Sequence, residues 1–192
     1  MRIFLAAVAI LTAVAGCQAG ASGKDGTQLR FRPVLRAWPA GPAVGPPGRR
    51  QSTNPGTQEA AARALSCAPE QPDDLDGRDD PVLPLVSCAR TGRTRYVLGP
   101  GFLSGAEVGS AEARLDPATG ETVLVLSFTD AGADTWAEWT RRNVGREFAV
   151  VLKSRVLAAQ RSNAVVTDGA VQVGLAASLP EAQRLARDID GA

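Results

Sequence analysis

The stretch ETVLVLSFTDAGADTWAEWTRRNVGREFAVVL, residues 121–152, decides the fold class. Residues 121–128 alternate, yet both faces are apolar, which predicts a strand in the middle of a sheet. A helix is expected over 130–142, capped by Thr129 or by its own first residue. The continuous apolar run at 148–152 is typical of another buried strand. A compact domain that combines helices and strands follows from these three elements.

Further strands and a helix extend this unit in both directions. Residues 107–115 are expected to pair with 121–128 across a turn at 116–120, where Pro stands early and Gly last. Shorter strands are expected at 82–87, 94–98, 156–159 and 171–173. The closing segment starts with Ser178-Leu179-Pro180-Glu181, a capping-box pattern, and continues with apolar residues on one helix face. The expected class is α+β, with a mixed sheet packed against two or three helices.

The N-terminal half is less regular. Residues 28–36 alternate and predict an edge strand, because Pro33 cannot donate a ladder hydrogen bond. Residues 39–56 are rich in proline and glycine and predict an extended loop, although such a segment can also be a ligand for aromatic grooves. A short helix capped by Thr57 is expected over 57–65.

An acidic loop is expected at 69–84. It carries several aspartates around Gly77, namely Asp73, Asp74, Asp76, Asp79 and Asp80. Such aspartates could form a calcium site, but aligning Gly77 with the glycine of an EF-hand loop puts Pro72 at the first ligand position and Leu83 at the last. A solvated loop is therefore the favoured interpretation.

The first residues read as a targeting segment. Arg2 precedes an apolar run that is too short to span a bilayer as a helix, and Val14-Ala15-Gly16-Cys17 resembles a bacterial lipobox. Residues 1–16 are thus predicted to be a lipoprotein signal peptide, and Cys17 the acylated residue (diacylglycerol and palmitate) of a tether at 17–27. The protein would then be anchored by lipid on the extracytoplasmic face of the cell membrane. The alternative is an ordinary cleaved signal peptide with an incidental cysteine.

The two remaining cysteines, Cys67 and Cys88, are predicted to form a structural disulfide, because bridges persist in exported proteins. A loop of this size contributes about 3 kcal/mol in the chain-entropy model. The alternative is a redox pair, but no Cys-x-x-Cys motif is present.

The composition excludes several classes of catalytic and metal site. The chain has 21 Lys+Arg against 20 Asp+Glu, a net charge of +1, and no histidine. The charge balance gives no reason to expect nucleic acid, and the missing histidines exclude Ser-His-Asp triads and His-containing zinc sites. We therefore predict no catalytic residue, metal or cofactor.

Two pairs of residues on the predicted 130–142 helix are candidates for binding. Trp136 and Trp139 could hold a ligand, although aromatic residues at helical spacing usually belong to a core. Arg141 and Arg142 could contact anionic lipid headgroups, together with Arg146 and Arg155, although a solvated face is the simpler explanation.

Several stretches carry a family resemblance when taken in order. They are LRFRPV at 29–34, YVLGP at 96–100, LSG at 103–105, VLVLSF at 123–128, FAVVL at 148–152 and VQV at 171–173. Their order and spacing resemble the head subdomain of the external (first periplasmic) domain of SecD, the membrane protein that assists the Sec translocon from outside. The proline- and glycine-rich loop and the two later cysteines resemble actinobacterial members.

The resemblance implies a SecD-head-like domain over 28–192. Where the family has an Asp-Gly turn this chain has Lys153-Ser154, so a different turn is expected. The chain stops where SecD would enter its membrane domain, so no proton-driven step is expected. The leading hypothesis is a non-catalytic lipoprotein that binds exported polypeptides or translocon components. The alternative is a lipoprotein that binds a small molecule or an envelope ligand, for which a cavity near Trp136 and Trp139 would be evidence.

Overall fold

The computed structural model describes residues 28–191, so the predicted signal peptide, Cys17 and the rest of the predicted tether lie outside it. The strands are β1 (Leu29–Pro39), β2 (Leu85–Cys88), β3 (Thr94–Leu98), β4 (Leu103–Ser104), β5 (Val108–Leu115), β6 (Thr122–Phe128), β7 (Glu147–Leu152), β8 (Arg155–Arg161) and β9 (Ala170–Gly174). The α-helices are α1 (Pro55–Ala64), α2 (Asp130–Arg142) and α3 (Leu179–Asp190), and a 3-10 turn, η2, spans Gly105–Glu107.

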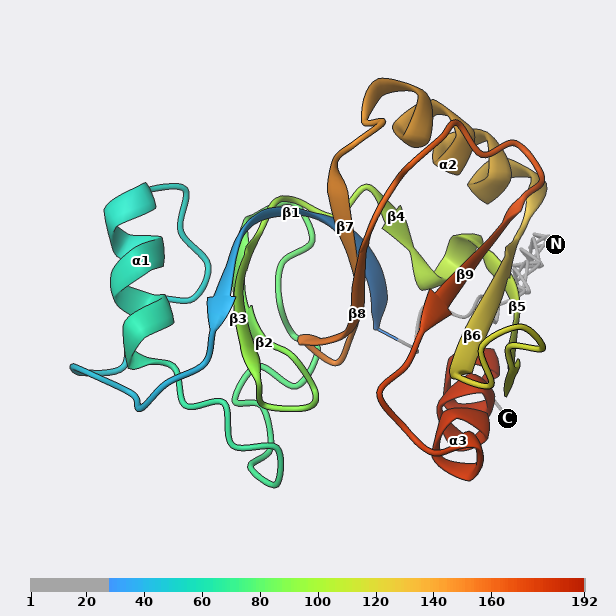
Figure 1. The fold of residues 1–192 in the computed structure, drawn as a ribbon. Helices are drawn as coiled ribbons and strands as arrows, with labels where there is room; N and C mark the ends of the chain where they lie inside the picture. Colours follow the sequence, from blue (N-terminus) through green and yellow to red (C-terminus); the bar gives the residue numbers. More distant parts are fainter. Residues whose placement is uncertain (1–27, 192) are drawn as a thin grey trace, which may run out of the picture.

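The strands divide between two antiparallel sheets (Figure 1). The larger sheet has the order β2-β3-β1-β7-β8, with β4 added beside β1, and the smaller has the order β5-β6-β9. The main core lies between the two sheets, α2 and α3, while α1 covers β2 and β3 at the far end of the larger sheet. The α+β class is confirmed, as are the central place of β6 and the burial of β7.

The first strand is central, so its prediction as an edge strand is wrong. β1 pairs with β7 over 29–33 and with β3 over 34–39. Pro33 is tolerated because its missing N–H faces the Gly99 carbonyl, to which the neighbouring Arg32 Nη1 donates instead at 2.9 Å. The Pro33 carbonyl still accepts from the Gly99 N–H at 2.8 Å. A side-chain donor has thus replaced the backbone donor that proline lacks.

The predicted hairpin forms between β5 and β6. Its turn is held by Asp116, whose Oδ1 accepts from the Ala118 and Thr119 N–H groups at 2.8 and 3.1 Å. These hydrogen bonds to the ionised form lower the pKa of the Asp116 carboxyl. Gly120, with φ +72°, supplies the left-handed residue that closes the turn.

The predicted N-cap residue is confirmed for α2 but not for α1. Thr129 caps α2 as expected, since its Oγ1 accepts from the Gly132 N–H at 3.2 Å. The cap of α1 is Asn54, whose Oδ1 accepts from the Thr57 N–H at 3.0 Å, so the prediction of Thr57 as cap is wrong. Asn54 precedes Pro55, a residue preorganised for the first helical position.

The capping box expected at the start of α3 does not form. Ser178 is the N-cap residue, but its side chain makes no capping hydrogen bond. Glu181 turns instead toward Arg90, with which it forms an ion pair at 3.3 Å. Glu181 therefore pairs with the Arg90 guanidinium of the β2–β3 turn, instead of accepting the backbone hydrogen bond at Ser178 that a capping box requires.

Candidate functional site

The segment 40–84, which connects β1 to β2, contains only one regular element, α1, and buried arginines fasten it to the larger sheet. Arg32 of β1 is fully buried, and its Nη2 contacts Asp79 Oδ2 at 2.6 Å. Its Nη1 donates to the Leu83 carbonyl at 2.8 Å. Burial lowers the pKa of the Arg32 guanidinium, and the Asp79 carboxylate partly offsets that effect. The planar guanidinium can serve these several acceptors at once, which an ammonium could not do with this geometry.

Ser154 completes the same network from the β7–β8 turn. Its hydroxyl donates to Asp79 Oδ1 at 2.5 Å and accepts from the Gly77 N–H at 2.8 Å. Lys153 and Ser154 have φ values of +50° and +63°, so the two-residue turn keeps the left-handed backbone that Asp-Gly would favour. The expectation of a different turn is therefore wrong. Hydrogen bonds to the buried Ser154 compensate for a backbone conformation that ordinary residues avoid.

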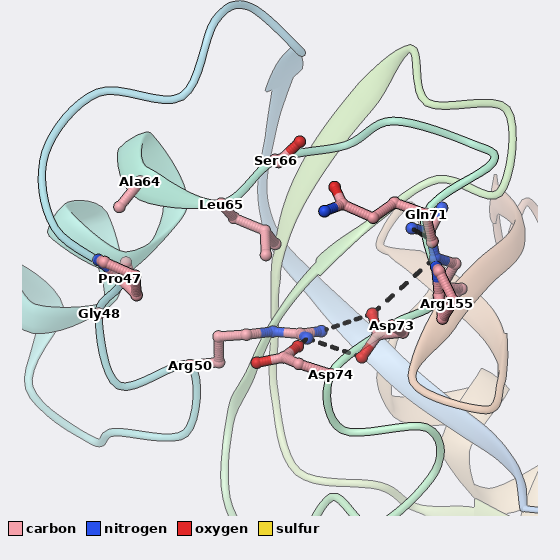
Figure 2. A pocket seen from close by; sticks show the side chains of 12 residues that line it. Pro47, Gly48, Arg50, Ala64, Leu65, Ser66, Gln71, Asp73, Asp74 and Arg155 are labelled. Carbon is pink, nitrogen blue, oxygen red and sulfur yellow. Dashed lines mark hydrogen bonds and ion pairs between the residues drawn. The ribbon is translucent and has the colours of Figure 1, made fainter.

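A second arginine network surrounds Asp73. Arg50 holds this carboxylate with two hydrogen bonds, from Nη1 to Oδ1 at 2.7 Å and from Nη2 to Oδ2 at 3.0 Å, and also contacts Asp74. The Arg155 Nε lies 4.0 Å from Asp73 on the opposite side, as Figure 2 shows. The side chains of Arg50 and Asp73 are only 5% and 7% exposed, so this part of the acidic segment is not a solvated loop.

A third arginine fixes the proline- and glycine-rich part. Arg95 of β3 donates from Nη2 to the carbonyls of Gly41 at 2.6 Å and Leu65 at 2.9 Å. Backbone carbonyls of an irregular segment need partners when they are covered, and arginines from the sheet provide them. The segment predicted as an extended loop is therefore irregular but attached at several points.

A hollow of about 260 Å³ lies over the Asp73 network (Figure 2). Its walls come from the 47–50 stretch, from α1 and from the acidic segment. A neighbouring hollow of about 410 Å³ shares Gln71, Asp73 and Arg155 with it and continues to Leu157 and Leu185, where the larger sheet faces α3. Both hollows combine apolar side chains with ionised groups, and in the first hollow Arg50, Asp73, Asp74 and Arg155 form one ion-pair network.

No metal site is formed within residues 28–191, where no three His, Cys, Asp or Glu side chains come together suitably. None of the helices in this range is long and apolar enough to cross a membrane. The structure joins Cys67 and Cys88 by a disulfide with Cα atoms 5.5 Å apart, as predicted. This bridge ties the end of the α1 region to β2.

The tryptophans predicted as ligand contacts are core residues. Trp136 is 1% and Trp139 9% exposed. Trp136 packs edge-to-face on Phe148, with ring centroids 4.9 Å apart, and Trp139 stacks on Phe102 at 4.4 Å. The cluster leaves no open tryptophan face for a ligand, which corrects the binding prediction for both and removes the basis of the small-ligand alternative at this place.

The arginines predicted as lipid contacts lie apart from the buried networks. Arg141 and Arg142 are exposed on the last turn of α2, and both pair with Glu138. Arg155, grouped with them in the sequence, belongs instead to the Asp73 network. The proposed basic patch is therefore smaller and partly neutralised.

The site residues that the sequence does not reveal are Arg32, Arg50, Asp79 and Ser154. The only signal for Arg32 is its place beside a proline in a predicted strand. Each network is built on an arginine, and the sequence hints at this only through its strong preference for arginine over lysine. Lys24 and Lys153 are the only lysines in the chain. Buried sites with several acceptors require arginine, but composition does not say which arginines are buried.

Comparison with known proteins places these features in a family context. The family model described as SecDF, P1 head subdomain, matches residues 84–192. The protein translocase subunit SecD of Mycobacterium tuberculosis is 34% identical over 124 residues, which are 65% of this chain and 22% of the relative. SecD of Acidaminococcus fermentans is 31% identical over 115 residues, 59% of this chain and 27% of the relative. The chain thus spans only 22% and 27% of these relatives.

One solved structure is also similar. It is a structure of SecDF, a membrane component that enhances protein export, and it matches 84% of this chain and 60% of its own chain at 27% identity and a TM-score of 0.49.

Proposed function

Because this chain belongs to the SecDF P1 head subdomain family, we propose that it acts in protein export on the outer side of the cell membrane. The observation that carries the proposal is the family match over 84–192, which includes eight of the nine strands and both helices of the main core. The chain would be a non-catalytic accessory module that binds exported polypeptides or translocon components. The paired charges of the first hollow and the apolar side chains of both hollows support a binding role over a catalytic one.

We further propose that Cys17 carries a lipid that holds the module at the membrane. The support is the Val14-Ala15-Gly16-Cys17 pattern after a short apolar run. Two or three acyl chains anchor firmly, since each buried CH₂ contributes about 0.8 kcal/mol. An anchored module would be kept close to the site where chains emerge.

The binding role can be tested by photo-crosslinking in intact cells. A photoreactive phenylalanine analogue at Gln71, which lines both hollows, is expected to capture exported chains or translocon components. The matched control is the same analogue at Thr119, an exposed position in the β5–β6 turn. Recovery of no export-related protein from Gln71, or equal recovery from both positions, would contradict the proposal.

The anchor is tested by Cys17→Ser. We expect the wild-type protein to incorporate labelled palmitate and to sediment with membranes, and the variant to lose both properties almost completely. Gln18→Ser is the control, because it changes the neighbouring residue and keeps the thiol. Membrane association and labelling that persist in Cys17→Ser would refute lipidation at this residue.

A further inference from the structure

The second half of β1 has a neighbouring strand on one side only. β7 runs beside β1 as far as Pro33, whereas β3 continues along Val34–Pro39. Figure 1 shows β1 leaving β7 and running on beside β3 toward α1. Over residues 34–39 the larger sheet therefore has an open edge, which we call the β1 edge. Leu35 is 55% exposed there, and Arg36 and Ala37 are exposed as well.

The pairing with β3 determines which backbone groups point outward. The Ala40 N–H donates to the Arg93 carbonyl at 2.8 Å, and the register continues Trp38↔Arg95 and Arg36↔Val97. In an antiparallel ladder every second residue exchanges both hydrogen bonds with the partner strand, so Arg36 and Trp38 face β3. The N–H and C=O groups of Ala37 and the C=O group of Pro39 then face away, whereas Leu35 lies at the bulge where the register shifts between Val34 and Arg36. Among the described residues, no backbone group outside the strand pairings forms a hydrogen bond with these three groups.

A hollow of about 250 Å³ lies beside this edge, on the face that α1 covers. It is lined by Arg36, Trp38, Glu59 and Arg63. Arg63 pairs with Glu59 at 2.5 Å, while Arg36 has no ion-pair partner in the part of the chain that the structure describes. The half-buried Trp38 provides an apolar wall. The hollow is therefore net positive and suits a carboxylate side chain.

We propose that the β1 edge binds an extended polypeptide segment as an added strand and that the hollow receives a carboxylate side chain of that segment. The outward groups of Ala37 and Pro39 would supply one donor and two acceptors for the main chain of the partner. Main-chain pairing gives affinity without regard to sequence, and Arg36 adds a preference for acidic segments. This inference rests on the proposed function, polypeptide binding, and specifies its place and chemistry.

The probe is a synthetic peptide, acetyl-Val-Thr-Val-Glu-Val-Thr-Val-amide, titrated into the ¹⁵N-labelled Cys17→Ser chain. We expect the Ala37 amide resonance to shift and its hydrogen exchange to slow on binding. A peptide with lysine in place of glutamate is expected to bind about fivefold more weakly, the loss of one exposed ion pair. A peptide with alternate amides N-methylated, which keeps its side chains but cannot pair along one edge, is expected not to bind there.

A substitution on the protein provides an independent test. Ala37→Pro removes one outward N–H and leaves the Arg36 and Trp38 pairs with β3, so peptide binding is expected to be lost. Ala37→Val keeps the N–H and is expected to bind normally. Shifts that map elsewhere, or equal binding of the N-methylated peptide to the wild-type chain, would overturn the inference without any variant having to fold. Pairing of two protein copies through this edge, seen as a dimer in sedimentation, would also overturn it.

The two proposals can fail separately. If Gln71 captures exported chains while no peptide perturbs residues 35–37, polypeptide binding stands and the β1 edge is not its site. If neither experiment detects a polypeptide, the proposed function itself fails.

Discussion

Replacing Arg32 by methionine is expected to lower the free energy of unfolding by about 3–5 kcal/mol, the range for removing one partner of a buried ion pair. The Asp79 side chain, only 4% exposed, would be left as an uncompensated charge. The carbonyls of Leu83 and Gly99 would also lose a donor. Because Gly99 cannot receive a hydrogen bond from Pro33, the substitution weakens the pairing of β1 with its neighbour as well. Urea denaturation of the Cys17→Ser chain with and without this substitution, monitored by tryptophan fluorescence, measures the change.

The matched control is Arg30→Met, on the same strand two residues earlier. Arg30 is only half-buried and donates to its neighbour's carbonyl, so a change within about 0.5 kcal/mol is expected. Combining Arg32→Met with Asp79→Leu removes both charges and is expected to recover part of the loss. An Arg32→Met variant that costs no more than Arg30→Met would show that the network does not stabilise the fold.

The parts of the fold that could be predicted are those whose cause is local. The hairpin follows from alternation on either side of a proline- and glycine-containing turn, and Thr129 caps the helix that starts one residue later. The continuous apolar run of β7 marks a strand with neighbours on both sides. The disulfide is equally predictable, because only two cysteines follow the predicted lipidation site. In each case the residues that determine the feature are either close together in the sequence or, like the two cysteines, so few that only one pairing is possible.

The buried networks could not be predicted because their partners are distant in sequence. Arg32 and Asp79 lie 47 residues apart, and Ser154 and Asp79 lie 75 apart. An aspartate-rich segment reads as solvated unless the arginines that neutralise it are known. Pro33 predicts an edge strand because proline lacks an N–H donor. In the structure the strand is central, because the Arg32 side chain donates to the distant Gly99 carbonyl instead.

A second large effect is expected at Trp136. Trp136→Ala should lower the free energy of unfolding by about 3–5 kcal/mol, the usual range for truncating a buried aromatic residue. The ring packs against Phe31 and Phe148, with centroids 5.8 and 4.9 Å away, and therefore joins α2 to β1 and β7. Its removal would leave a cavity where helix and sheet meet. Thermal and urea denaturation of the variant would measure the loss.

Trp136→Phe separates packing from ligand contact. The Trp136 Nε1 has no hydrogen-bond acceptor within the described residues, so phenylalanine forfeits no hydrogen bond and keeps an aromatic ring against Phe148. We expect this variant to lose clearly less stability than Trp136→Ala and to retain full crosslinking from Gln71. If Trp136 instead contacted a ligand, both variants would reduce binding while leaving the unfolding free energy nearly unchanged. That outcome would contradict its assignment to the core, because a side chain 1% exposed cannot be removed without cost to packing.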